Sequence, residues 1–272
     1  MQENLSSIAE FTPSSTSCQE HPSPSEIRPN RHQIVAFVSQ KGGVGKTTTA
    51  THAREWFSTF GSACLVDADA QRSSSRWIAS MSAAKKISIP MTVIGDAHTL
   101  LKELPKLREQ FDYTIVDAPG SLEDVSRAIL SRCDVVVVPY LSGHLDIDSN
   151  KKTLEMIEIA QDIRGGMPKA AIFINRAEEG TILLNETKQA VDRDLSNTRI
   201  VRLKTIVHKR QCIIDVPGQR TNIFDTAAEI ESRRRLQPSP KKKQGKTKLP
   251  AEVLARNEYD ALFKEIARIM NA

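Results

Sequence analysis

The residues best suited to chemistry form one glycine-rich octad. It lies between a short apolar run and a helix-forming stretch, and it reads Lys41, Gly42, Gly43, Val44, Gly45, Lys46, Thr47 and Thr48. Glycines let the backbone curl so that successive N–H groups point at one anion. A helix N-terminus behind them adds partial positive charge. In this pattern Lys46 reaches the β- and γ-phosphates and Thr47 can ligate Mg²⁺. The octad therefore predicts a binding loop for ATP and Mg²⁺.

The loop departs from the ordinary phosphate-loop pattern at its start. Gln40 stands where that pattern has glycine, and a second lysine, Lys41, follows it. A lysine at this edge lies poorly for the γ-phosphate of its own nucleotide, but it can reach a nucleotide held by a facing subunit. It then supplies positive charge to the transition state only in a dimer, as an arginine finger does in trans. We therefore expect an ATP-dependent homodimer in which both Lys41 and Lys46 are catalytic.

Three carboxylates follow apolar runs and are candidates for the same site. Asp67 and Asp69 end the second run, and Asp117 follows the fourth. Because the carboxyl ends of parallel strands meet at one edge, we expect these acids near the phosphate loop. An acid after a buried strand matches the Walker B position, so Thr47 and Asp117 are the predicted metal-side residues. The alternative for Asp67 and Asp69 is that they cap the next helix.

Apolar runs and helical stretches alternate along most of the chain. Strand candidates lie at 34–38, 63–66, 91–94, 113–116, 135–138 and 170–174, and helix candidates at 46–60, 73–81, 97–110 and 146–164. Several of the strand candidates are apolar throughout, which indicates burial on both faces. The pattern predicts an α/β fold with a doubly wound, mostly parallel sheet and helices on both faces.

The ends of the chain differ from this region and set the expected domains. Residues 1–31 are rich in Ser, Pro and Glu without sustained periodicity, so we expect a disordered arm before an ATPase domain at 32–232. Residues 233–249 gather basic residues around two prolines and are expected to form a flexible basic linker. Residues 250–272 carry apolar residues at helical spacing and are expected to pack on the domain as an amphipathic helix.

Composition narrows the class of protein further. The chain has 272 residues, a net charge of +5 and 39% hydrophobic residues. It contains no apolar run near the roughly 20 residues that cross a bilayer, and it begins without a secretion signal, so a cytoplasmic location is expected. Its four cysteines are far apart, which argues against a cysteine-bound metal cluster and a disulfide framework. The basic excess is compatible with nucleic acid without requiring it.

Lys41 and Lys46 together resemble the deviant Walker A box of the ParA/MinD family of ATPases. The resemblance covers about residues 33–230 and is closest to small ParA proteins of the ParF kind, through short matches at 111–122, 145–148, 209–211 and 223–225. It implies that Asp69 orients the attacking water and that Asp67 supports it. Ala70 replaces the usual proline of the family at this point.

The resemblance also implies partners and a role. In this family ATP drives a sandwich dimer that binds DNA without sequence preference, and a ParB-type centromere-binding partner stimulates hydrolysis. By that analogy the chain drives plasmid or chromosome segregation and associates with the nucleoid in its ATP state. The candidate DNA contacts are Lys209 and Arg210, with a further contribution from Arg233, Arg234 and Arg235 unless these belong to a merely solvated linker. Asn175, at a strand end, is placed to read the adenine.

Two alternatives share the same nucleotide chemistry. A ParA-like protein can position a protein cargo or a conjugation complex, and in that case only the partner differs. A MinD-like membrane switch needs a C-terminal amphipathic helix with a basic polar face. The last helix here carries Glu252, Asp260 and Glu265, so we do not expect membrane binding.

Overall fold

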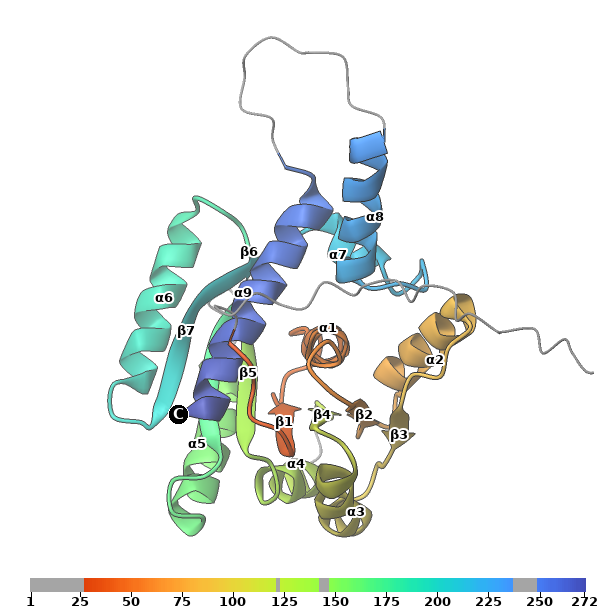
Figure 1. The fold of residues 1–272 in the computed structure, drawn as a ribbon. Coiled ribbons are helices and arrows are strands. Elements are labelled where there is room, and N and C mark those ends of the chain that lie inside the picture. Colours follow the sequence, from red (N-terminus) through yellow and green to blue (C-terminus); the bar gives the residue numbers. More distant parts are fainter. Residues whose placement is uncertain (1–26, 121–122, 142–146, 237–248) are drawn as a thin grey trace, which may run out of the picture.

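A computed structural model describes residues 27–120, 123–141, 147–236 and 249–272. Their centre is a seven-stranded sheet in the order β3-β2-β4-β1-β5-β6-β7, and every pairing in it is parallel (Figure 1). The strands are β1 (Gln33–Phe37), β2 (Ala63–Asp67), β3 (Met91–Val93), β4 (Tyr113–Asp117), β5 (Val135–Leu141), β6 (Lys169–Ala177) and β7 (Ile200–His208). The predicted α/β, doubly wound fold is confirmed.

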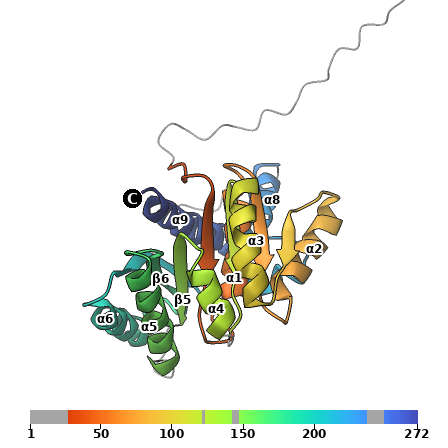
Figure 2. The same cartoon turned by 90° about the horizontal axis from the view of Figure 1, so that it is seen from below.

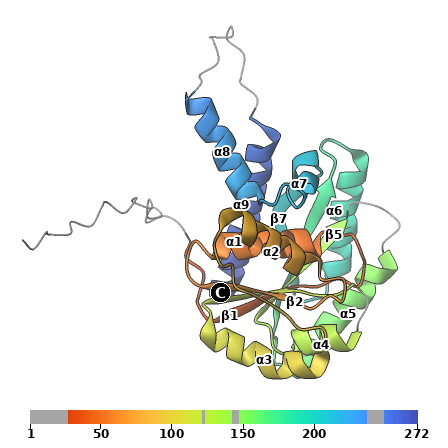
Figure 3. The same ribbon diagram turned by 90° about the vertical axis from the view of Figure 1, so that its right-hand side faces the viewer.

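Helices cover both faces of the sheet (Figures 2 and 3). One face packs against α1 (Lys46–Phe57), α2 (Ser73–Lys85), α7 (Gln211–Asp215), α8 (Ile223–Leu236) and α9 (Ala251–Asn271). The other face packs against α3 (Ala97–Gln110), α4 (Glu123–Leu130), α5 (Ile147–Ile163) and α6 (Ile182–Leu195). The central strands are buried on both faces for this reason, as their continuous apolar runs predicted.

Strand order places the site. The chain leaves β1, forms β2 and β3 on one side, returns to form β4 beside β1, and then builds β5 to β7 on the other side. Ligands of such sheets bind at the carboxyl edge, where the order reverses. The loops after β1, β2 and β4 therefore meet there.

The edge strand β7 is not predicted by the sequence patterns. Only Ile200, Leu203 and Val207 of this strand are buried, and polar and charged residues lie between them. The strand therefore lacks the continuous apolar run of the central strands. Two glutamates of α9 bond to its backbone. Glu265 accepts from the N–H groups of Lys204 (2.7 Å) and Thr205 (2.8 Å), and Glu258 accepts from that of His208 (3.0 Å). Helix α9 thus satisfies donors that an edge strand would otherwise leave unpaired.

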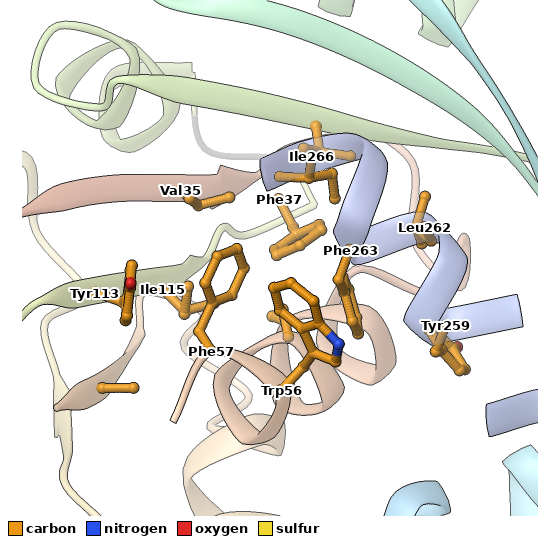
Figure 4. Close-up of a cluster of buried hydrophobic side chains, with 14 of the residues drawn as sticks. Val35, Phe37, Trp56, Phe57, Tyr113, Ile115, Tyr259, Leu262, Phe263 and Ile266 are labelled. Atoms are coloured by element: carbon orange, nitrogen blue, oxygen red, sulfur yellow. The ribbon is translucent and has the colours of Figure 1, made fainter. Parts of the chain in front are cut away.

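Helix α9 is also part of the core. Its buried face lies over α1 and β1 in an aromatic cluster that includes Trp56, Phe57, Tyr259 and Phe263 (Figure 4). The indole N–H of Trp56, in α1, donates to the carboxylate of Asp260, in α9, at 2.9 Å. Since this apolar face is buried against the sheet, it is not presented to a membrane surface. Across the described parts of the chain, no helix is long and apolar enough to span a bilayer.

The structure moves two of the expected boundaries. Before β1, the Tyr113 hydroxyl donates to the Pro29 carbonyl (3.0 Å) and the Asn30 N–H donates to Asn271 (2.8 Å), so ordered contacts begin within the expected arm. Helix α8 continues to Leu236, so the three arginines at 233–235 lie in its last turns and not in a linker. The stretch from residue 223 to 236 contains no proline or glycine to stop a helix. Residues 1–26 and 237–248 lie outside the described parts of the chain.

A buried histidine joins three of these helices. His52 of α1 is fully buried and stacks on Tyr259 of α9, with ring centroids 4.6 Å apart. Its Nε2 accepts from the N–H of Ile223, the first residue of α8, at 3.1 Å. Its Nδ1 therefore carries the proton and donates to the Thr48 carbonyl at 2.6 Å. Burial lowers the pKa of His52 to about 4, although the Thr48 carbonyl and the charge of Asp225 act in the opposite direction.

This histidine predicts a loss of stability in mild acid. Below its ordinary pKa of 6.5 the unfolded chain takes up a proton that the folded chain excludes until about pH 4, so the stability that neutral His52 contributes is lost as the pH falls through this window. Between pH 7.5 and pH 5 we expect His52 to account for a fall of about 2 kcal/mol in the free energy of unfolding. Urea titrations of the wild type and of His52→Gln at both pH values measure this difference.

The matched control is His98→Gln, because His98 is exposed. It should keep the pH dependence of the wild type. Equal pH dependence in the wild type and in His52→Gln would show that His52 is not the titrating group.

Candidate nucleotide-binding site

The phosphate loop lies between β1 and α1, with the N-terminus of α1 behind it. Gly43 and Gly45 have positive φ angles of +75° and +98°. At Gly45 glycine is required twice over, since a Cβ there would also lie 2.2 Å from Nδ2 of Asn175. Val44, between these glycines, is buried and anchors the loop. The backbone geometry is that of an anion-binding nest at a helix N-terminus.

Lys46, the first residue of α1, lies against the loop. Its Nζ donates to the carbonyl of Lys41 at 2.9 Å, and the side chain is largely buried. Burial lowers the pKa of Lys46, while the negative charges of Asp117 and Asp69 raise it. Gly120, which follows β4, faces this amine and the Gly42 backbone. The site thus holds a cation beside two acids, and the backbone after β4 approaches it closely.

Asp117 ends β4 and is the most strongly perturbed acid of the site. Its Oδ2 accepts from the Thr47 hydroxyl at 2.8 Å, and the residue is fully buried. Burial raises the pKa of Asp117 to about 7, with Asp67 adding to the rise, while hydrogen bonding from Thr47 and Ser74 and the charge of Lys46 oppose it. Its Oδ1 and the Ser74 hydroxyl are both buried without a hydrogen bond of full geometry.

Thr47 and Asp117 together form a site that fits Mg²⁺. A hydroxyl and a buried carboxylate with an unsatisfied oxygen are oxygen ligands, directly or through water, of the kind that Mg²⁺ prefers. Among the residues that the structure describes, no group of three or more His, Cys, Asp or Glu could hold a metal ion on its own. The site therefore suits an ion held mainly by phosphates and water, with Thr47 and Asp117 completing its surroundings.

Asp67 and Asp69 have different positions. Asp67 is fully buried, and its two oxygens accept from the N–H groups of Asp69 (3.1 Å) and of Ser75 in α2 (2.8 Å). It therefore caps α2 and fixes the loop that carries Asp69. Asp69 is only half-buried and accepts from the Gln71 N–H at 2.8 Å. The capping alternative thus describes Asp67 well, and its capping also holds Asp69 in place.

The edge of the loop that carries Lys41 is held by hydroxyl groups. The Lys41 N–H donates to Oγ of Ser39 (3.2 Å), and the Gln40 N–H donates to Oγ1 of Thr153 in α5 (3.2 Å). Ser39 and Thr153 are buried, and no sequence motif pointed to either of them. The action of Lys41 on the nucleotide of a second subunit stays a prediction.

Asn175 supports the loop from β6. Its Nδ2 donates to the Val44 carbonyl (2.7 Å) and its Oδ1 accepts from the Arg176 N–H (3.0 Å). Arg176 in turn donates to the Gly43 carbonyl at 3.2 Å. Because Asn175 is only 3% exposed and both ends of its amide are bonded, its clearest role in this structure is to hold the loop. The adenine contact stays a prediction.

A cavity of about 280 Å³ opens beside the loop. On one side it is lined by loop residues and Thr48. On the other it is lined by the end of β7 and by apolar residues of α7 and α9 and the turn after α7, namely Ile213, Ile214, Tyr259 and Pro217. These apolar residues come from segments more than 150 positions after the loop, so local sequence patterns could not identify them.

The expected DNA contacts are spread over two regions. Lys209 and Arg210 line the cavity, and Arg210 donates to both oxygens of Glu258 at 2.5 and 2.8 Å with 14% of its side chain exposed. This pairing argues against Arg210 as a phosphate contact. Lys209 is half-exposed, with Glu178 at 3.4 Å. The arginines at 233–235 are exposed at the end of α8 and are not among the residues that line the cavity.

Comparisons with known proteins agree with this fold. The maintenance of carboxysome distribution protein A of Halothiobacillus neapolitanus is 28% identical over 204 residues, which are 75% of this chain and 92% of that protein. An ATP complex of McdA from Cyanothece has a TM-score of 0.59 at 15% identity, covering 79% of this chain and 100% of that one. Cobyrinic acid a,c-diamide synthase of Mycobacterium smegmatis, with an ATP analogue and magnesium bound, has a TM-score of 0.53 at 18% identity, covering 75% and 96%.

The two solved structures share the fold with this chain, and each binds ATP or an analogue of it. The relatives support the ParA/MinD type in general, but not the finer expectation of a small ParA of the ParF kind. The VirC1 protein family matches residues 32–215, which include the phosphate loop, all three acids and Asn175. This match covers well over half of the sequence, and the chain therefore belongs to the VirC1 protein family, within the ParA/MinD-type ATPase superfamily.

Proposed function

We propose that this protein is an ATP-hydrolysing dimer that positions a protein cargo inside the cell. The observation that carries the proposal is the relationship to the carboxysome distribution protein of Halothiobacillus neapolitanus, which extends over 92% of that protein. Segregation of plasmid or chromosomal DNA, the first expectation from the sequence, has less support, because this relative is named for the distribution of a protein compartment. Positioning of a cargo, the alternative in the sequence analysis, is the function we favour.

The roles of the residues follow from the site. ATP with Mg²⁺, when bound, supplies the phosphoryl group whose hydrolysis drives the cycle. The loop N–H groups and Lys46 hold the triphosphate, and Thr47 and Asp117 face the metal. Asp69, on its half-buried loop, orients the attacking water, while Asp67 fixes that loop. The base extends into the cavity between the loop and α9, near Asn175.

A positioning ATPase also needs a surface to move on, and we infer that this surface is the nucleoid. Non-specific DNA binding needs exposed cations that can approach phosphates, and its affinity falls steeply with salt. Lys209 and the arginines at 233–235 of α8 are exposed enough for this, whereas Arg210 is committed to Glu258. We expect the ATP-bound dimer to occupy the nucleoid, and a cargo adaptor to take the place of a ParB-type partner.

The two lysines of the loop should fail in different ways. Lys46→Ala should weaken ATP binding at least tenfold, since it removes a charge-assisted contact worth about 1.5–3 kcal/mol. Lys41→Ala should bind ATP normally but lose ATP-dependent dimerisation, and with it the gain in DNA affinity that ATP confers. Nucleotide titrations, light scattering and DNA titrations with ATP, with ADP and without nucleotide measure these effects. Lys102→Ala, at an exposed position of α3, is the control. Normal dimerisation of Lys41→Ala would refute the action in trans.

Asp117 should trade stability for function. Its folded-state pKa of about 7 lies above the ordinary 3.8, so ionisation of this buried group lowers the stability of the ligand-free protein as the pH rises between these values. In Asp117→Asn this penalty is absent, so the stability of the variant relative to the wild type should increase by about 2.5 kcal/mol between pH 5 and pH 8. The same variant should lose the stabilisation that MgATP gives the wild type.

Urea titrations with and without MgATP measure both effects. Asp124→Asn makes the same chemical change at an exposed position and should alter neither. If the difference in stability between Asp117→Asn and the wild type were the same at both pH values, Asp117 would not have the raised pKa that we assign to it.

A retention assay separates cargo positioning from DNA segregation. A small replicon that carries the gene, either as wild type or as Lys46→Ala, is grown without selection for many generations. We expect equal retention of the two replicons, since the cargo is a protein assembly. Faster loss of the Lys46→Ala replicon would contradict cargo positioning and would favour a function in DNA segregation.

A further inference from the structure

Helices α4 and α5 lie on the face of the sheet opposite α1 (Figure 2). Residues of both helices line an apolar groove. Its volume is about 500 Å³, and its lining is mainly apolar. Leu130 and Met156 are buried there, whereas Ile159 and Ile163 of α5 are 60% and 80% exposed. Two isoleucines one turn apart, left in water beside a hollow, mark a surface that a partner segment can cover.

The charges around this groove are mostly positive. Arg127 of α4, Lys152 of α5 and Arg164 line it, together with a single acid, Glu155. An occupant that carries apolar residues and a net negative charge would fit both features.

The first 26 residues of the chain have this character. They contain four glutamates, at positions 3, 10, 20 and 26, and no lysine or arginine, in a chain with 38 basic residues. Leu5, Ile8 and Phe11 recur at a spacing of three, and Glu3 and Glu10 lie within two positions of them in the sequence. No other use has been assigned to this segment.

We propose that the acidic N-terminal segment (residues 1–26) docks in the α4–α5 groove of its own chain, with Leu5, Ile8 and Phe11 against Ile159 and Ile163. The segment joins the described chain at Ile27, which packs on the α1 and α9 side of the sheet. The 15 residues from Thr12 to Glu26 can extend about 50 Å, which is twice the length of about 25 Å expected for the 17-residue α5. The segment is therefore long enough to pass around the sheet and reach the groove.

The surface of the protein offers a path for it. Ser131 and Arg164 line both the groove and a second hollow of about 640 Å³, and this hollow extends to His32 and Arg108 beside the start of β1. The two hollows are thus neighbours, and the second one lies between the start of β1 and the groove.

The groove also borders the residue that precedes the phosphate loop. Gln40 lines its other end, and its N–H is bonded to Thr153 of α5. Gln40 precedes Lys41 directly, so a segment docked along α5 lies next to the loop that faces a second subunit. Docking and dimerisation therefore concern neighbouring surfaces.

Photo-cross-linking in the intact chain tests the docking. Phe11 is replaced by the photo-reactive p-benzoylphenylalanine, the protein is irradiated without nucleotide, and the products are mapped by mass spectrometry. We expect cross-links within one chain to residues of α4 and α5, with Met156 among them. The yield should fall about tenfold in Ile159→Asp and in Ile163→Asp, because each change removes a buried apolar contact and adds a negative charge. Glu3→Lys combined with Glu10→Lys should lower it as well.

The control is Ile87→Asp, since Ile87 is 54% exposed beside α2 and β3, away from the groove. It should keep the yield of the unsubstituted groove. Cross-links between two differently isotope-labelled chains would identify a second copy as the occupant and overturn the proposal. Cross-links elsewhere, or a yield indifferent to Ile159→Asp, would overturn it too. None of these readouts uses ATP or cargo, so they are independent of the proposed function.

Discussion

The buried hydrogen bond between Thr47 and Asp117 is the interaction on which the site depends. It joins the first turn of α1 to the end of β4, and it can form only because β4 pairs with β1 in the sheet. A buried acid with a raised pKa is costly to the empty protein, and Lys46 beside it offsets only part of that cost. The fold thus contains a buried carboxylate oxygen without a hydrogen bond, which lowers the stability of the empty protein but can interact with a metal-bound triphosphate. Such a loss of stability for the sake of function is common in proteins.

The helices on the α1 face are linked so that the nucleotide site and the C-terminal part of the chain form one body. His52 connects Thr48, at the nucleotide cavity, to the first residue of α8, and it stacks on Tyr259 of α9. A second link is polar: Lys85 of α2 contacts both Glu55 of α1 and Asp225 of α8. Helix α8, whose far end carries the exposed arginines, is therefore anchored to the helix that follows the phosphate loop and to the helix that follows the Asp69 loop.

Local patterns predicted the parts of this protein that local chemistry determines. Glycines with a lysine after an apolar run identified the phosphate loop, and continuous apolar runs identified the central strands, because burial on both faces requires such runs. Long-range pairings could not be found in this way. The contact of Arg210 with Glu258 joins positions 48 apart, and only the folded chain removes this arginine from the set of DNA-binding candidates. Asn175 was predicted to contact the adenine, and its bond to Val44, which depends on how β6 lies in the sheet, was not foreseen.

The same reasoning explains why the identity of the cargo is harder to infer from the sequence than the nucleotide-binding site. A phosphate loop must meet the fixed geometry of a triphosphate, so its residues are tightly constrained in type and spacing. A docking surface needs only apolar area and complementary charge, and many sequences satisfy that requirement. The α4–α5 groove belongs to this second kind. One end of the groove nevertheless lies next to the phosphate loop, because Gln40, which lines that end, directly precedes Lys41. A partner that covers the groove can therefore influence the loop through one peptide unit, without a change in the sheet that supports both.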